Sequence, residues 1–326
     1  MSPDGGVLTL GETMASLRSS GPLRLGGPLH LSIAGAESNV AIGLARLGHR
    51  ASWAGVVGAD ELGALILRIL RAEGVALGAA RVEPAAPTGL ILFEHRIADI
   101  TRVQYRRAGS AGSRLSPADV DAAFAAGPPA VLHWTGITPA LGEAPRQAVA
   151  HAAALARAAG SLRSFNVNYR AALWPRHDAA AVISSLAAGA DLVVAAADEL
   201  FLAVPGTGPS GRGGSRDEPE QARILLESGT GEVLVTAGSA GATLYRPDGM
   251  WQQPAAHVRA VDSVGAGDAF IAGYLSGLLD GLAPQDRLAR AATTAAFSVA
   301  ALGDWEGLPT RAELPLLASG PGATLR

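Results

Sequence analysis

One ten-residue segment in the last quarter of the chain has residue types that could bind an anion and accept a proton. It reads Val261-Asp-Ser-Val-Gly-Ala-Gly-Asp-Ala-Phe270 and is followed by apolar residues at helical spacing. Glycines at a helix start leave the first-turn N–H groups uncovered, and the helix dipole adds partial positive charge there. A carboxylate at Asp268 would lie beside that spot, where it can take a proton from an attacking hydroxyl. Alternatively, Asp268 only caps the helix and the glycines only turn the chain.

A second segment, residues 34–48, combines small residues with the start of another helix. It reads Ala-Gly-Ala-Glu-Ser-Asn-Val-Ala-Ile-Gly-Leu-Ala-Arg-Leu-Gly. Gly35 lets a ligand approach the backbone, and the Asn39 amide can both donate and accept hydrogen bonds toward a polyol. The simpler interpretation is a helix capped at its N-terminus by Ser38.

Composition removes several classes of function. The 326 residues include no cysteine and no lysine, and the net charge is −3. The chain therefore has no disulfide framework, thiolate metal site, Walker A lysine or Schiff-base lysine. The small negative charge gives no basic surface for nucleic acid and no polybasic membrane patch. The first residues lack the pattern of a signal peptide, so we expect a cytoplasmic protein.

The elements that position these segments alternate between short apolar runs and long Ala/Leu-rich stretches. The expected strands are 7–10, 51–57, 131–134, 162–167, 192–195, 232–236 and 242–245. The expected helices are 38–47, 62–73, 144–159, 178–187, 219–227, 267–279 and 284–301. This alternation predicts an α/β fold: a three-layer α/β/α arrangement with a mostly parallel central sheet. Binding sites in such sheets lie beyond the carboxyl ends of the strands.

Two extended segments depart from the alternation. Gly27–Ala34 and Thr88–Arg107 are not followed at once by helices, so we expect them to form a small β-sheet lid. The alternative is an extra antiparallel edge of the main sheet. Residues 205–219 are rich in Gly, Pro and Ser, which is typical of a mobile surface loop.

The two signature-like segments together resemble those of the ribokinase-type (PfkB) sugar kinases, and the resemblance extends from Thr9 to about Pro309. Within that family the sequence is most similar to the 2-keto-3-deoxygluconate kinases. The segments that carry this are 35–39, 105–112, 135–141, 166–170 with 173–174, and 303–307. The resemblance implies one ribokinase-like kinase domain over residues 1–326, with lid segments inserted at about 12–34 and 88–108.

The resemblance also implies a role for residues at matching positions. Asp268 would be the catalytic base, with Gly265, Ala266 and Gly267 as the anion hole. The sugar acid would contact Gly35, Asn39, Tyr105, Arg107, Arg170 and Asp304. The nucleotide side of the site would include Asn168, Glu199, Thr236, Gly238 and Gly241. No residue is assigned as a direct metal ligand, because Mg²⁺ would be held by phosphates and water.

The implied reaction is the transfer of a phosphoryl group from ATP, with Mg²⁺, to a hydroxyl of a sugar or sugar acid. Two arginines, Arg107 and Arg170, favour an acid because a guanidinium fork matches a carboxylate. Each has a structural alternative: Arg107 as a solvated lid residue and Arg170 as part of an ion pair. Tyr105 has one as well, since it could equally be a packing residue of the lid. A homodimer through the lid would cover its exposed edge.

Four residues depart from the family pattern. They are Asn166, where many relatives have Asp, together with Ala196, Ala240 and Ile91. Two alternatives therefore stay open. One is the same chemistry on another substrate, such as fructose, ribose or a nucleoside. The other is a sugar-binding protein that has lost kinase activity.

Overall fold

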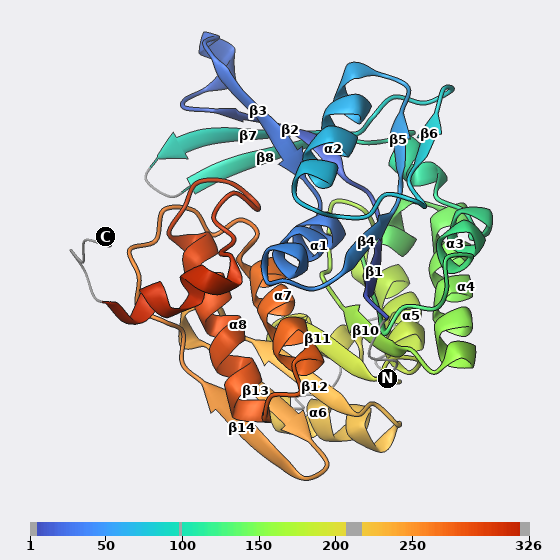
Figure 1. The fold of residues 1–326 in the computed structure, drawn as a ribbon, viewed down its shortest axis with the longest axis vertical. Coiled ribbons are helices and arrows are strands. Elements are labelled where there is room, and N and C mark those ends of the chain that lie inside the picture. Colours follow the sequence, from blue (N-terminus) through green and yellow to red (C-terminus); the bar gives the residue numbers. More distant parts are fainter. Residues whose placement is uncertain (1–4, 98–99, 207–216, 320–326) are drawn as a thin grey trace.

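The computed structural model describes residues 5–97, 100–206 and 217–319. Eight strands form its main sheet: β1 (Val7–Leu10), β4 (Ala51–Ala54), β9 (Val131–Thr135), β10 (Leu162–Asn166), β11 (Leu192–Ala196), β12 (Glu232–Thr236), β13 (Ala242–Arg246) and β14 (Gly249–Gln253). Their order is β14-β13-β12-β11-β10-β9-β1-β4 (Figure 1). Neighbours from β12 to β4 are parallel, whereas β13 and β14 pair antiparallel. The predicted mostly parallel sheet is confirmed.

Helices cover both faces of this sheet. They are α1 (Ala36–Arg46), α2 (Glu61–Ala72), α3 (Pro117–Phe124), α4 (Glu143–Ala159), α5 (Arg176–Ala187), α6 (Glu218–Glu227), α7 (Ala266–Leu279) and α8 (Pro284–Val299). Successive strand residues point to opposite faces. Val7 and Val131 accordingly pack in the core with α1, α7 and α8, whereas Leu8 and Leu132 pack with α4, α5 and α6. The three predicted layers are therefore present, with one apolar core on each side of the sheet.

The lid is a separate sheet of four strands. They are β2 (Met14–Ser19), β3 (Leu29–Ala34), β7 (Leu90–Ile97) and β8 (Ile100–Arg106), in the order β3-β2-β7-β8. β2 and β7 pair in parallel, and the other two pairs are antiparallel. Figure 1 shows these strands together at the upper left, apart from the main sheet. The alternative of an added edge strand was therefore wrong.

The first crossover differs from the predicted single strand 51–57. The chain leaves the main sheet at Gly55, where a Cβ atom would lie 2.6 Å from the Gly11 carbonyl oxygen. The rest forms β5 (Val56–Gly58), which pairs with β6 (Arg81–Glu83).

Most of the loop predicted at 205–219, residues 207–216, lies outside the described part. None of the described helices combines the length and the hydrophobicity needed to cross a bilayer.

Candidate active site

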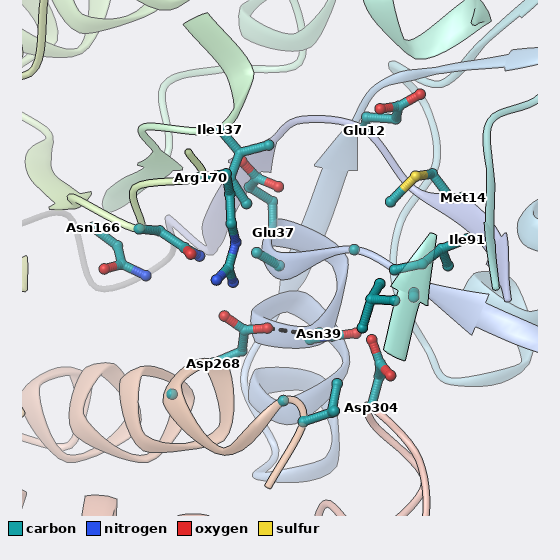
Figure 2. A pocket seen from close by; sticks show the side chains of 18 of the residues that line it. Glu12, Met14, Glu37, Asn39, Ile91, Ile137, Asn166, Arg170, Asp268 and Asp304 are labelled. Atoms are coloured by element: carbon teal, nitrogen blue, oxygen red, sulfur yellow. Dashed lines mark hydrogen bonds between the residues drawn. The ribbon is translucent and has the colours of Figure 1, made fainter. Parts of the chain in front are cut away.

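A cavity of about 420 Å³ lies at the carboxyl ends of the parallel strands, between the main sheet and the lid. Among the side chains predicted to act, it is lined by Gly35, Asn39, Tyr105, Arg107, Asn168, Arg170, Glu199, Thr236, Gly265, Gly267, Asp268 and Asp304. These residues come from segments more than 250 positions apart. The fold thus gathers most of the predicted site residues around one space (Figure 2).

The anion-binding end of the cavity is the start of α7. Gly265 precedes the helix with φ 76°, a left-handed conformation that glycine adopts without strain. A Cβ atom there would lie 2.0 Å from the Asp304 carbonyl oxygen, so this position also requires glycine for space. At Gly267, by contrast, a Cβ atom would meet nothing within 4 Å. The Ala266 N–H approaches the Ser263 carbonyl, whereas the N–H groups of Gly267 and Asp268 have no partner inside the helix and are open to a ligand.

Asp268 lies in the first turn of α7 and accepts a hydrogen bond of 2.9 Å from the Asn39 side-chain nitrogen (Figure 2). Burial raises its pKa to about 7, although the Asn39 hydrogen bond and the charge of Arg170 lower it. A carboxyl group with this pKa is partly ionised near neutral pH, as a general base requires. The Asn39 oxygen Oδ1 is buried without a partner, and it can accept a hydrogen bond from a polyol.

Glu37 is a buried carboxyl at the cavity that the sequence reasoning did not assign. It is 1% exposed and accepts hydrogen bonds from the Thr135 and Thr138 hydroxyls, at 2.7 and 2.8 Å. Burial raises its pKa, which favours the neutral form. These contacts tie the first turn of α1 to the chain that follows β9. Glu37 lies in the same segment, residues 34–48, as Gly35 and Asn39, and this position could have marked it as a residue of the site.

Arg107 lines the cavity, but it is not the solvated lid residue considered above. Its Nε donates to Glu12 at 2.7 Å, and Glu12 also accepts from the Ser110 hydroxyl. The pair is almost completely buried. Burying one charge beside the other is tolerable only because each has its partner. Glu12 was missed because nothing local in the sequence shows that it meets Arg107, 95 positions away.

Arg170 differs from Arg107 because its guanidinium forms no hydrogen bond or ion pair with a described residue. Figure 2 shows it reaching into the cavity toward Asp268. Burial raises the pKa values of Asp268 and Glu199, and the charge of Arg170 opposes that rise. The structural ion pair considered for Arg170 is therefore absent from the described residues, and its donors are free for an anionic ligand.

Asp304 lies on the opposite side of the cavity from Arg170 (Figure 2). Burial raises its pKa to about 8, the attraction of Arg18 lowers it, and Asp268, Glu306 and Asp262 raise it. Arg18 contacts Asp304 Oδ1 at 3.4 Å. A carboxyl group in this environment can exchange hydrogen bonds with a sugar hydroxyl.

The side of the cavity that the sequence predicts to take the nucleotide contains Asn166, Asn168 and Glu199. Asn168 has φ 38°, and asparagine is among the residues that tolerate this conformation best. Among the described residues, no group of three or more His, Cys, Asp or Glu side chains is placed to hold a metal ion. The Glu199 carboxyl group beside the amides of Asn166 and Asn168 nevertheless suits Mg²⁺ that is bound by phosphates and keeps its water ligands. Glu199 would contact such an ion through one of those waters.

The lid contributes an apolar wall. Met14, Ile91 and Phe93 form a small buried cluster against which Tyr105 and Val264 pack. Tyr105 therefore serves lid packing and also lines the cavity. Val264 precedes the start of α7, so the wall touches the anion-binding loop itself.

Three predicted residues do not line the cavity. Ala266 begins α7, and its backbone N–H approaches the Ser263 carbonyl at 3.4 Å. Gly238 and Gly241 flank the turn between β12 and β13, next to Thr236. At Gly241 a Cβ atom would lie 2.1 Å from the Gln253 carbonyl, so its structural role is to close this turn.

Comparisons with known proteins identify the family of this chain. A sequence profile described as "pfkB family carbohydrate kinase" matches residues 7–311. A 2-dehydro-3-deoxygluconokinase of Thermoproteus tenax is 35% identical over 314 residues, which cover 94% of this chain and 92% of that protein. The enzyme of that name from Bacillus subtilis (strain 168) is 37% identical over 315 residues, 94% of each chain. A solved PfkB protein from Polaromonas sp. JS666 has a TM-score of 0.82 and 34% identity, covering 95% of this chain and 99% of its own.

The two glycines of the anion-binding loop give a matched test of this geometry. Gly265→Ala should lower the free energy of unfolding by about 1–3 kcal/mol, because alanine is strained at this φ and clashes with the Asp304 carbonyl. Gly267→Ala, in a helical conformation with open space, should stay within about 0.5 kcal/mol of the parent protein. Chemical denaturation measures both values. Equal stability of the two variants would contradict the close approach of Asp304 to Gly265.

Proposed function

Because the chain belongs to the pfkB family of carbohydrate kinases and is a sugar kinase, we propose that it phosphorylates 2-keto-3-deoxygluconate, also called 2-dehydro-3-deoxygluconate, with MgATP. The observation that carries the kinase chemistry is the position of Asp268 beside the open N-terminus of α7, inside the cavity. The terminal hydroxyl of the sugar acid is the proposed acceptor.

The proposed step is a direct transfer between two oxygen atoms. The acceptor hydroxyl oxygen forms a bond to the γ-phosphorus as the bond from that phosphorus to the bridging oxygen of ADP breaks. Asp268 receives the hydroxyl proton, and ADP leaves with the electron pair of the broken bond. Negative charge spreads over the transferring phosphoryl oxygens, where the N–H groups at the start of α7 stabilise it. Mg²⁺, when bound with the nucleotide, would neutralise phosphate charge.

Polar groups of the cavity suit a polyol, and one of them, Arg170, supports a sugar acid rather than a neutral sugar. The Arg170 guanidinium is free to pair with a carboxylate, and such a pair forms two parallel hydrogen bonds. The unpartnered Asn39 Oδ1 and the carboxyl group of Asp304 can bind hydroxyls. The relatives from T. tenax and B. subtilis are named for the same substrate.

The roles of the other site residues follow from their places in the cavity. Gly35 lets the sugar approach the backbone at the start of α1, and Tyr105 with Arg107 encloses it from the lid. Asn168, Glu199 and Thr236 border the nucleotide, with Gly238 and Gly241 in the adjoining turn. ATP is the proposed donor.

We also propose that two chains associate through their lids. β3 is an edge strand of the lid, and its Leu29 and Leu31 are 41% and 46% exposed. Leu25, in the turn before β3, is 74% exposed. An edge strand with apolar side chains is a surface that proteins usually cover.

The first test is the pH dependence of turnover. Because Asp268 must be ionised to accept the proton and burial raises its pKa to about 7, kcat/KM should fall about tenfold per unit as pH decreases below that value. In Asp268→Asn this fall of kcat/KM at low pH should disappear, and kcat should be roughly 10²-fold lower or more while sugar binding persists. Coupled detection of ADP release measures turnover, and calorimetry measures binding.

The control for this test is Asp248→Asn, which changes an exposed carboxylate in the turn between β13 and β14. It should leave both kcat and the pH profile unchanged. Near-normal turnover of Asp268→Asn would remove Asp268 from the mechanism. Sugar binding by the parent protein without product in MgATP would instead identify a binding protein without kinase activity.

The second test asks what Arg170 recognises. Arg170→Met should raise KM for 2-keto-3-deoxygluconate about 10- to 100-fold, because a charged hydrogen-bond partner of the carboxylate is lost. KM for ATP should change little, and Arg102→Met, on the exposed side of the lid, should change neither. An equal fall of kcat for keto acid and fructose would assign Arg170 to the phosphates instead. Faster turnover of the parent protein on a neutral sugar would contradict the substrate assignment.

The third test concerns the lid-to-lid dimer. Light scattering coupled to size exclusion should give the mass of two chains for the parent protein and of one chain for Leu31→Asp. Val82→Asp places the same charge at another exposed apolar position, 48% exposed on β6, and should remain dimeric. A monomeric parent protein would exclude the proposed dimer.

A further inference from the structure

Arg18, on strand β2 of the lid, joins the lid to two acidic residues of the catalytic loops. Its Nη1 lies 2.8 Å from Asp262 Oδ2 and its Nη2 lies 3.4 Å from Asp304 Oδ1. The arginine side chain is 11% exposed, and the two carboxylates are 8% and 9% exposed. A planar guanidinium can bridge two acceptors in this way, whereas an ammonium group acts as a point charge.

Both acidic residues contact the loop that precedes α7, Asp262 through its carboxylate and Asp304 through its backbone. Asp262 Oδ1 accepts the Val264 backbone N–H at 3.1 Å, and its Oδ2 accepts the Gly303 N–H at 3.3 Å. The backbone of Asp304 is the wall against which Gly265 packs. A shift of either residue would therefore displace the start of α7, where the transferred phosphoryl group is proposed to bind.

The position of Arg18 is set by the lid. Its guanidinium carbon lies 4.3 Å from the centre of the Phe93 ring, which belongs to the neighbouring strand β7. Phe93 is part of the apolar wall of the active-site cavity. Stacking on this ring and burial leave the arginine little freedom, so its charge is presented to the loops in one place.

A second cavity, of about 260 Å³, lies on the far side of this ion-pair network. Arg18 lines this cavity but not the active-site cavity, whereas Asp304 lines both. Arg18 therefore acts from behind Asp304, and it does not reach the space in which the substrates are proposed to bind.

The local charge explains why a cation is needed at this place. Asp304 is faced by Asp262, Asp268 and Glu306, all of which raise its pKa, and Arg18 opposes them. His30 of β3 lines the second cavity from the lid side. In the described parts of the chain, Arg18 is the one cationic side chain that forms an ion pair with Asp262 or Asp304.

We propose that Arg18 is a positioning residue for phosphoryl transfer, which holds Asp262 and Asp304 against the start of α7. Through these ion pairs the lid and the anion-binding loop keep a fixed position relative to each other. The inference rests on the proposed function for its kinetic consequence. The structural claim, that Arg18 of the lid keeps the loop before α7 ordered, does not rest on the proposed function.

The test compares Arg18→Met, which keeps the apolar stem over Phe93, with Arg18→Lys, which keeps the charge. Arg18→Met should lower kcat/KM for the sugar acid about 10- to 100-fold, with a larger rise in KM for the sugar than for ATP. Arg18→Lys should recover part of the loss. Arg24→Met, exposed on the lid, should match the parent protein.

Two further measurements separate positioning from a merely structural role. Removing Arg18 leaves buried carboxylates without a partner, which destabilises a protein. Arg18→Met with Asp262→Asn removes one of them and should recover thermal stability without recovering kcat/KM. Full recovery of both, or normal kinetics of Arg18→Met in folded protein, would overturn the proposal.

Hydrogen exchange tests the inference independently of any activity. In Arg18→Met the Val264 N–H should exchange at least about fivefold faster than in the parent protein, because its acceptor Asp262 is released. Unchanged exchange would overturn the proposal even if the enzyme is active. Faster exchange in a protein that phosphorylates no sugar acid would uphold the positioning role while refuting the proposed function.

Discussion

The site depends on Asp268 being able to ionise inside a cavity whose burial disfavours the ionised form. Burial alone would hold Asp268 neutral, and a neutral carboxyl group cannot accept a proton. The Asn39 hydrogen bond and the positive charge of Arg170 oppose burial, and the pKa lies at about 7. Because Asn39 belongs to α1 and Asp268 to α7, the proposed base exists only when these two helices pack together. The core shared by α1, α7 and β1 is therefore part of the chemistry.

Five carboxyl groups, Glu199 among them, border this cavity, and their surroundings divide the other four into two kinds. Glu12 is paired with Arg107 at 2.7 Å, and Glu37 is held by two threonine hydroxyls. These two are committed to protein contacts. Asp268 and Asp304 have pKa values raised to about 7 and about 8, so both can exchange protons or hydrogen bonds with a ligand. Environment, rather than residue type, separates structural acids from reactive ones.

The parts that could be predicted from the sequence are those encoded by local patterns. Strand and helix alternation gave the layers, and the segments around Asn39 and Asp268 marked two helix starts that meet in the cavity. Helix α3 was missed because its eight residues are too few for a clear period, and β14 because Gly249-Met-Trp-Gln-Gln253 lacks apolar alternation. The Arg18–Asp304 contact spans 286 positions, and no local pattern encodes such a pairing.

The absence of lysine shapes how the lid is attached. Arginine is the only fully charged basic side chain in this sequence, and its guanidinium keeps its charge and its planar donors when buried. Arg18 can therefore reach two carboxylates at once while it stacks on Phe93, and Arg107 can stay ionised beside Glu12. Both pairs lie next to the apolar wall of Met14, Ile91 and Phe93. Apolar surroundings strengthen the attraction between the two partners and make either charge costly without the other, so the surface that excludes water from the reaction also keeps these ion pairs together.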